Sequence, residues 1–253
     1  MAHIRCDFRS EVLDMNTSMT VVLPEDIPVC DAKVVYLFHG LADNCTGWSR
    51  YSSVERYARE YSLALVIPEV QRSFYSSMEY GLDYFKFIHD ELPDICSRLF
   101  GISKEREKNY VMGLSMGGYA ALKCALNTPG RYAGCAAFSA AADIAARIAE
   151  SGTARKLEYT AMFGPELRVP EDSDLFALAE KVCVPELPEF YIACGEQDEL
   201  YSQSVDFTAL LEKLGADAIF EHWAGIHNWE FWDAAVLRAF RHMFERCRND
   251  EVR

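Results

Sequence analysis

The sequence predicts an α/β fold, in which a mostly parallel, doubly wound sheet carries helices on both faces. Two observations lead to this prediction. Short runs with strand character alternate with longer helical stretches along the chain, and these runs are apolar throughout, which is typical of strands covered on both faces. The expected strands are residues 18–23, 34–38, 64–67, 110–112, 134–138, 190–193 and 218–222.

The stretches between these runs predict the helices. They cover residues 54–61, 82–100, 118–126, 173–182, 202–214 and 230–246. Pro93 lies inside the second of them, so we expect that helix to kink or restart near the proline, which cannot donate a backbone hydrogen bond.

Two regions depart from simple alternation. At the N-terminus, Ile4–Leu13 and Ser18–Leu23 are joined by the polar residues 14–17, which predicts an antiparallel hairpin at the sheet edge. Residues 140–182 contain several glycines and prolines and interrupt the strand–helix pattern. They could form a small lid or cap, or equally an ordinary surface excursion.

Length and composition predict one domain over residues 1–253, because 253 residues that are 50% hydrophobic suffice for one large core. No run of about 18 apolar residues predicts a membrane span. The N-terminus turns polar too early for a signal peptide. The nine cysteines are scattered, with no C-x-x-C pair, which favours reduced thiols and a cytoplasmic location.

The net charge of −14 bears on the partners of the chain. It argues against nucleic acid and against anionic membranes, because both are negatively charged. It does not disfavour a small neutral molecule, which is the partner that we expect. The oligomeric state stays open, and a homo-oligomer is one option.

The residues Gly113, Ser115 and Gly117 form a G-x-S-x-G motif between a predicted strand and a predicted helix. A serine between two glycines at such a junction can be held on a sharp turn with its hydroxyl exposed above the sheet, ready to act as a nucleophile. The alternative is a glycine-rich turn that only joins the two elements. The strand–turn–helix context favours the nucleophile, which then needs a base, an acid and an oxyanion hole.

Of the six histidines, His227 is the expected general base, since it lies in the loop after the last predicted strand. The preceding strand, Phe190–Cys194, leads into a loop with three carboxylates. We expect Asp198 to orient His227, with Glu196 and Glu199 as alternatives. The order Ser, Asp, His along the chain is that of α/β-hydrolases.

The oxyanion hole needs two backbone N–H groups. We expect one from Met116, directly after the serine, and the other from Leu41, in the loop that follows the strand Val34–Phe38. The substrate-binding residues expected around this centre are His39, Gly40, Trp48, Tyr80 and Trp229. For each aromatic residue, core packing is the alternative.

Taken together, these residues resemble the esterase D-type esterases, and within them the tributyrin esterases. The resemblance rests on residues 113–119, on His39-Gly40 followed by Trp48, on Gly195-x-x-Asp198, and on His227-x-Trp229-x-x-Trp232. It covers roughly residues 34–240. It implies an α/β-hydrolase fold with a Ser-Asp-His triad, which falls on the three residues chosen above, and neither metal nor cofactor.

The resemblance also implies the activity, a serine carboxylesterase that cleaves short acyl or aryl esters through an acyl-enzyme. Relatives act on thioesters such as S-formylglutathione, on acetylated or feruloylated sugars, or transfer acyl groups, so these remain alternatives. A hydrolase-fold protein without activity, serving as a binding module, is the alternative from a different class.

Overall fold

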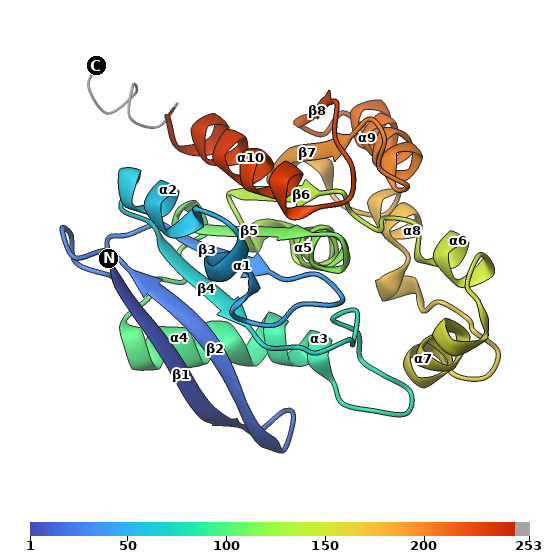
Figure 1. Cartoon of the computed structure of the whole chain (residues 1–253), viewed down its shortest axis with the longest axis horizontal. Helices are drawn as coiled ribbons and strands as arrows, with labels where there is room; N and C mark the ends of the chain where they lie inside the picture. The colour runs from blue at the N-terminus through green and yellow to red at the C-terminus, as the bar shows by residue number, and fades with distance from the viewer. Residues whose placement is uncertain (246–253) are drawn as a thin grey trace.

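The computed structural model describes residues 1–245, and an eight-stranded sheet runs through it (Figure 1). The strand order is β1-β2-β4-β3-β5-β6-β7-β8, with β1 and β2 antiparallel to their neighbours and all other pairs parallel. This confirms the predicted mostly parallel sheet with an antiparallel hairpin at its edge. The strands are β1 Ala2–Ser10, β2 Met15–Leu23, β3 Val34–Phe38, β4 Ala64–Pro68, β5 Asn109–Leu114, β6 Gly134–Phe138, β7 Glu189–Gly195 and β8 Ala218–Trp223.

Helices cover both faces of the sheet. One face carries α1 (Gly47–Tyr51), α2 (Val54–Glu60) and α10 (Trp229–Phe240). The other face carries α4 (Leu92–Phe100), α5 (Met116–Asn127), α8 (Leu175–Ala179) and α9 (Tyr201–Leu214). No helix within residues 1–245 has both the length and the apolar character needed to cross a bilayer.

The central strands explain this two-sided arrangement. In β3, Val34, Tyr36 and Phe38 belong to one apolar cluster, whereas Val35 and Leu37 belong to the other. Successive side chains of a strand point to opposite faces, so a strand that is apolar at every position must be buried on both sides. The continuous apolar runs of the sequence therefore correspond to the layered core.

The N-terminal hairpin turns earlier than the sequence predicted. The first strand ends at Ser10 and the second begins at Met15, so the connection is residues 11–14 and not 14–17. The Ser10 hydroxyl accepts the N–H of Leu13 at 2.9 Å, and the Glu91 carboxylate accepts the N–H of Glu11 at 2.7 Å. A side chain that is remote in sequence, Glu91, thus helps to fix the turn, and a local pattern does not reveal this contact.

The predicted helix over residues 82–100 restarts before its proline. A short α3 (Tyr84–Lys86) leads into a π-helical turn over Phe87–Glu91, and α4 begins at Leu92. Pro93 has no N–H to give to the preceding turn, and a π turn absorbs the register change that results.

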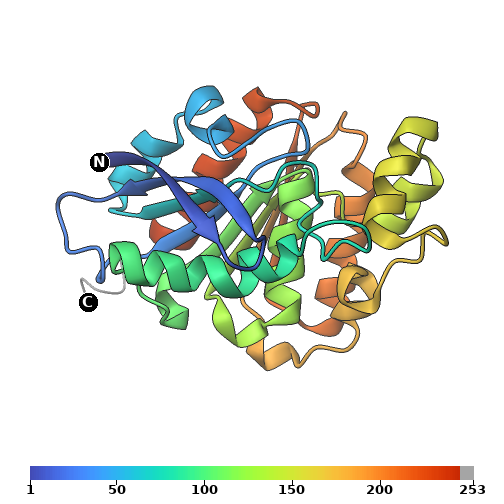
Figure 2. The ribbon, with the colours of Figure 1, turned by 90° about the horizontal axis from the view of Figure 1, so that it is seen from below.

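Residues 140–182 contain more helix than the sequence predicted. They include α6 (Ile144–Ala149), α7 (Thr153–Phe163), a 3-10 turn at Glu171–Ser173, and α8, which is shorter than the predicted 173–182. In Figures 1 and 2, α6 and α7 lie at the side of the molecule opposite the N-terminal hairpin.

Candidate active site

Ser115 occupies a strained turn between β5 and α5. Its backbone adopts φ 53° and ψ −116°, a conformation that residues other than glycine seldom adopt. The Ser115 N–H donates to the Phe138 carbonyl on the neighbouring strand at 2.8 Å, which anchors the turn to the sheet. Such a turn lifts the side chain above the strand ends, as the sequence motif predicted.

The two glycines of the motif are required by space. A Cβ atom on Gly113 would lie 2.3 Å from the carbonyl oxygen of Gly117, and one on Gly117 would lie 2.4 Å from the carbonyl oxygen of Phe38. Both obstacles are backbone atoms, which cannot rotate away as a flexible side chain can. The motif therefore lets the chain fold back closely enough to present Ser115.

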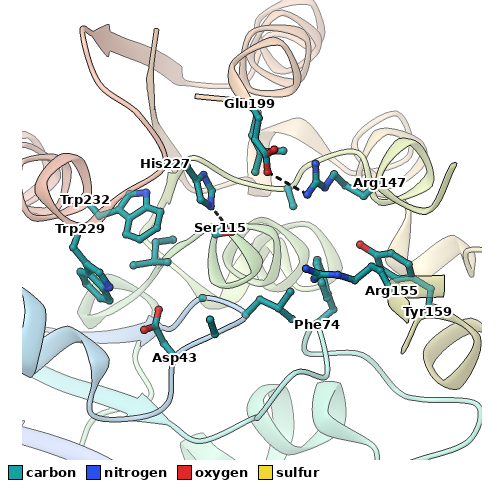
Figure 3. Close-up of a pocket in the computed structure, with 16 residues that line it drawn as sticks. Asp43, Phe74, Ser115, Arg147, Arg155, Tyr159, Glu199, His227, Trp229 and Trp232 are labelled. Carbon is teal, nitrogen blue, oxygen red and sulfur yellow. Dashed lines mark hydrogen bonds and ion pairs between the residues drawn. The ribbon is translucent and has the colours of Figure 1, made fainter. Parts of the chain in front are cut away.

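Three side chains that are distant in sequence meet at this turn. The Ser115 Oγ lies 3.0 Å from His227 Nε2. Figure 3 marks this contact with a dashed line. On the other side of the ring, His227 Nδ1 lies 2.9 Å and 3.1 Å from the two carboxylate oxygens of Asp198. With Nδ1–H donating to the carboxylate, Nε2 is left as an acceptor for the serine hydroxyl.

The surroundings of Asp198 keep it ionised. Its side chain is fully buried, and desolvation alone would raise the pKa. Hydrogen bonds from His227 and from the backbone N–H of Leu200 outweigh that effect, so the pKa lies below its ordinary value. A buried carboxylate that stays charged is suited to orient an imidazole and to stabilise its protonated form.

The alternative carboxylates, Glu196 and Glu199, do not contact His227. Glu196 lies 3.0 Å from His222 Nδ1, and Glu199 pairs with Arg147 at 3.3 Å. Of the three candidates in this loop, the structure brings only Asp198 to the imidazole.

The loop after β3 lies directly against Ser115. A Cβ on Gly40 would be 3.8 Å from the Ser115 Cβ, so the backbone at this position approaches the serine closely. Leu41 lines the cavity above the serine, and Met116 is the first residue of α5. The first N–H groups of a helix have no partner within the helix, so that of Met116 is free to bind an anion.

Hydrogen bonds that involve His39 fix the loop after β3. The His39 ring is fully buried, and burial lowers its pKa, which favours the neutral form. Nε2 accepts the Val70 N–H at 3.3 Å, so Nδ1 carries the proton and donates it to the Gly40 carbonyl at 2.8 Å. The Tyr75 hydroxyl donates to the His39 carbonyl at 3.1 Å. These bonds fix the backbone that carries Leu41.

A cavity of about 350 Å³ opens above Ser115 (Figure 3). Asp43, Trp229 and Trp232 form the wall on one side of the serine. On the opposite side, the cavity is lined by Phe74, Arg147, Arg155, Tyr159 and Glu199.

Of the five residues predicted to bind substrate, Gly40 and Trp229 line this cavity. The other three do not. His39 and Trp48 are fully buried, and Tyr80 is 62% exposed elsewhere on the surface. The Trp48 indole donates to the Phe38 carbonyl at 3.0 Å and packs edge-on against Trp229, with ring centroids 5.2 Å apart. Trp48 therefore packs against Trp229, which lines the cavity, without lining the cavity itself.

Several of the cavity residues that the sequence did not predict come from the region 140–182. Arg147 lies on α6, and Arg155 and Tyr159 lie on α7. The disturbed pattern of this region predicted a lid or a surface excursion, but no motif indicated which side chains would reach the serine. Phe74 comes from a loop where Phe74 and Tyr75 both have positive φ, which no local sequence signal predicts.

Comparison with known proteins places the chain in a family. The Esterase family, described as "Putative esterase", matches residues 10–243. The chain belongs to this family. It is 30% identical to the acetyl esterase of Caldicellulosiruptor saccharolyticus, an alignment that covers 96% of this chain and 98% of that protein.

Two solved structures from Staphylococcus aureus are also similar. Each is 32% identical, over an alignment that covers 96% of this chain and 98% of the Staphylococcus aureus chain. One is the fluorophosphonate-binding serine hydrolase FphF, with a TM-score of 0.88. The other is the S-formylglutathione hydrolase FrmB, with a TM-score of 0.85. The protein is thus a serine ester hydrolase with the α/β-hydrolase fold.

Proposed function

We propose that this esterase hydrolyses short-chain carboxylic esters through a triad of Ser115, His227 and Asp198. The observation that carries the proposal is the continuous chain of contacts from the Ser115 hydroxyl through both nitrogens of His227 to the buried Asp198 carboxylate. Each contact has the length of a hydrogen bond. The order serine, histidine, aspartate is the one that proton transfer from the serine needs.

The reaction proceeds in two steps. His227 Nε2 takes the proton from Ser115 as its Oγ attacks the ester carbonyl, and the resulting imidazolium then protonates the leaving alcohol. Water repeats the sequence on the acyl-enzyme and releases the acid. Asp198 stabilises the imidazolium at both stages without taking its proton.

The oxyanion of each tetrahedral intermediate is bound by the N–H groups of Met116 and Leu41. The position of Met116 at the start of α5 and of Leu41 at the cavity wall supports these roles. Loss of one such donor typically raises the barrier by about 3 kcal/mol.

The cavity supports a short acyl group. Its volume of about 350 Å³ is at the lower end for ligand sites, and bulky side chains (Phe74, Trp229 and Trp232) close its walls. We further propose that α6 and α7 act as a cap over the serine, since both contribute residues to the wall opposite the tryptophans.

A chain-length series tests this function. p-Nitrophenyl esters from acetate to decanoate are assayed with the purified protein and with Ser115→Ala. We expect the highest kcat/KM on the short esters and loss of turnover in Ser115→Ala. An optimum at decanoate would reject the short-chain assignment, and unchanged turnover by Ser115→Ala would reject the nucleophile.

A thioester hydrolase is the second candidate, favoured by the 32% identity to the S-formylglutathione hydrolase of Staphylococcus aureus. Comparison of S-formylglutathione with p-nitrophenyl acetate at equal enzyme concentration separates the two. A kcat/KM that is higher for the thioester would assign that activity instead.

A further inference from the structure

The part of the cavity wall that α6 and α7 form carries two arginines, although the chain as a whole has a net charge of −14. Arg147 comes from α6 and Arg155 from α7. In Figure 3 the Arg155 guanidinium points from α7 toward the part of the cavity where Ser115 lies. Whether either arginine can bind a substrate depends on how far its charge is already balanced.

The charge of Arg147 is balanced. Its Nη2 lies 3.3 Å from a carboxylate oxygen of Glu199, and its Nη1 lies 3.9 Å from Glu150. The hydrogen bond to Glu199 therefore competes with any ligand for this guanidinium.

Arg155 is in a different situation. Its Nε lies 3.7 Å from a carboxylate oxygen of Glu158, beyond hydrogen-bond distance, and its side chain makes no hydrogen bond to any residue within 1–245. Glu158 is already held by Arg72, whose Nε and Nη2 each donate to one of its oxygens at 3.0 Å. The cluster of Arg72, Glu158 and Arg155 has two positive charges and one negative charge. Arg155 lines the cavity, and no side chain within residues 1–245 offers its five donors an acceptor at hydrogen-bond distance.

We infer that Arg155 binds an anionic group of the substrate, so that the enzyme prefers short esters that carry a carboxylate. This inference rests on the proposed esterase function and adds to it a substrate class. A guanidinium presents a planar pair of N–H donors that fits the two oxygens of a carboxylate. Ser115 and Arg155 line the same cavity, so one small molecule can present its ester carbonyl to the first and its carboxylate to the second.

The carboxylate can belong to the acyl part or to the alcohol part of the ester, and two pairs of substrates distinguish these cases. For the acyl part, mono-p-nitrophenyl adipate is compared with p-nitrophenyl hexanoate, which has the same chain length without the charge. For the alcohol part, 3-carboxyphenyl butyrate is compared with 3-methylphenyl butyrate. Enzyme-free rates are subtracted throughout.

The variants are Arg155→Met, Arg155→Lys and, as a matched control, Arg168→Met. Arg168 lies in the same region of the chain and is exposed outside the cavity. The quantity measured is the ratio of kcat/KM for the charged ester to kcat/KM for its neutral partner. In Arg155→Met we expect this ratio to fall about 10- to 100-fold for one of the two pairs. Arg155→Lys should retain part of the preference, and Arg168→Met all of it.

Three results would overturn the inference. The wild-type protein could show no preference for either charged ester, or Arg155→Met could slow both members of each pair by the same factor, which indicates a structural role. In both cases hydrolysis of the neutral esters would leave the proposed function intact. If the wild-type protein hydrolyses none of the four esters, the proposed function fails, and the inference fails with it.

Discussion

The indole of Trp232 meets the ring of His227 edge-on, with centroids 4.9 Å apart and the ring planes at 89° (Figure 3). The same indole donates its N–H to the Ser139 hydroxyl at 3.1 Å. Asp198 holds only one edge of the imidazole, so Trp232 supplies a second constraint on the ring. Trp232 is therefore a positioning residue for the proposed general base.

Replacement of Trp232 by Phe tests this role. The variant keeps an aromatic ring but loses the N–H to Ser139, which should lower the free energy of unfolding by about 1 kcal/mol. We expect kcat on p-nitrophenyl butyrate to fall several-fold because the imidazole is less well fixed. Trp223→Phe is the control, since Trp223 stacks on Phe231 and does not line the cavity. Equal kcat values for the two variants would contradict the role.

The Asp198→Asn substitution keeps the shape of the carboxylate and removes its charge. An amide favours the wrong tautomer of the imidazole, so kcat should drop on the order of 10,000-fold. Glu196→Gln and Glu199→Gln serve as matched controls, because these side chains pair with His222 and Arg147 instead. A comparable loss in either control would transfer the role away from Asp198.

The close packing at the serine turn predicts that Gly117→Ala destabilises the protein. The new Cβ would meet the Phe38 carbonyl oxygen at 2.4 Å, and overpacking of this kind typically costs about 1–3 kcal/mol. Gly130→Ala is the control, because no atom lies within 4 Å of its Cβ position. Urea denaturation measures both, and esterase activity should be lost only in Gly117→Ala. Equal stability of the two variants would refute the steric argument.

Because Lys123 is buried, we expect the free energy of unfolding to rise with pH in the alkaline range. Lys123 is fully buried on α5, with Nζ donating to Ser173 at 2.8 Å, and desolvation lowers its pKa to about 8. An unfolded chain keeps this proton to about pH 10.4, so the unfolded state binds more protons above pH 8. The free energy of unfolding should therefore gain up to about 1.4 kcal/mol per pH unit as the pH rises from about 8 toward 9.5.

Urea denaturation between pH 7 and 9.5 measures this contribution against Lys123→Met. The variant lacks the titrating group, so the difference between the two curves isolates Lys123 from the other groups that titrate in this range. Below about pH 8 the difference should be flat, because the lysine is protonated in both states. A difference that is independent of pH throughout would contradict the prediction.

The sequence predicted the parts of the fold that depend on local pattern. The apolar runs predicted all the central strands, because a strand buried on both faces is composed mainly of apolar residues. The place of Ser115, His227 and Asp198 at strand ends followed from the same topology, since the carboxyl ends of parallel strands share one edge of the sheet.

What the sequence did not predict depends on contacts between distant residues. The hairpin turn is fixed by Glu91, and the positions of Arg147 and Arg155 depend on how α6 and α7 pack beside the sheet. The position of His39 next to the loop that carries Leu41 predicted a contact with substrate. Its ring instead faces inward and donates to the Gly40 carbonyl. Neither packing nor ring direction is encoded in a short motif.

We propose Ser115 as the nucleophile, activated by His227 and Asp198. The most direct measurement is mass spectrometry of the protein after reaction with a fluorophosphonate, with the adduct mapped to its residue. We expect one adduct, on Ser115, formed in step with the loss of esterase activity and much more slowly in His227→Ala. An adduct on another residue, or full esterase activity in the protein labelled at Ser115, would contradict the claim.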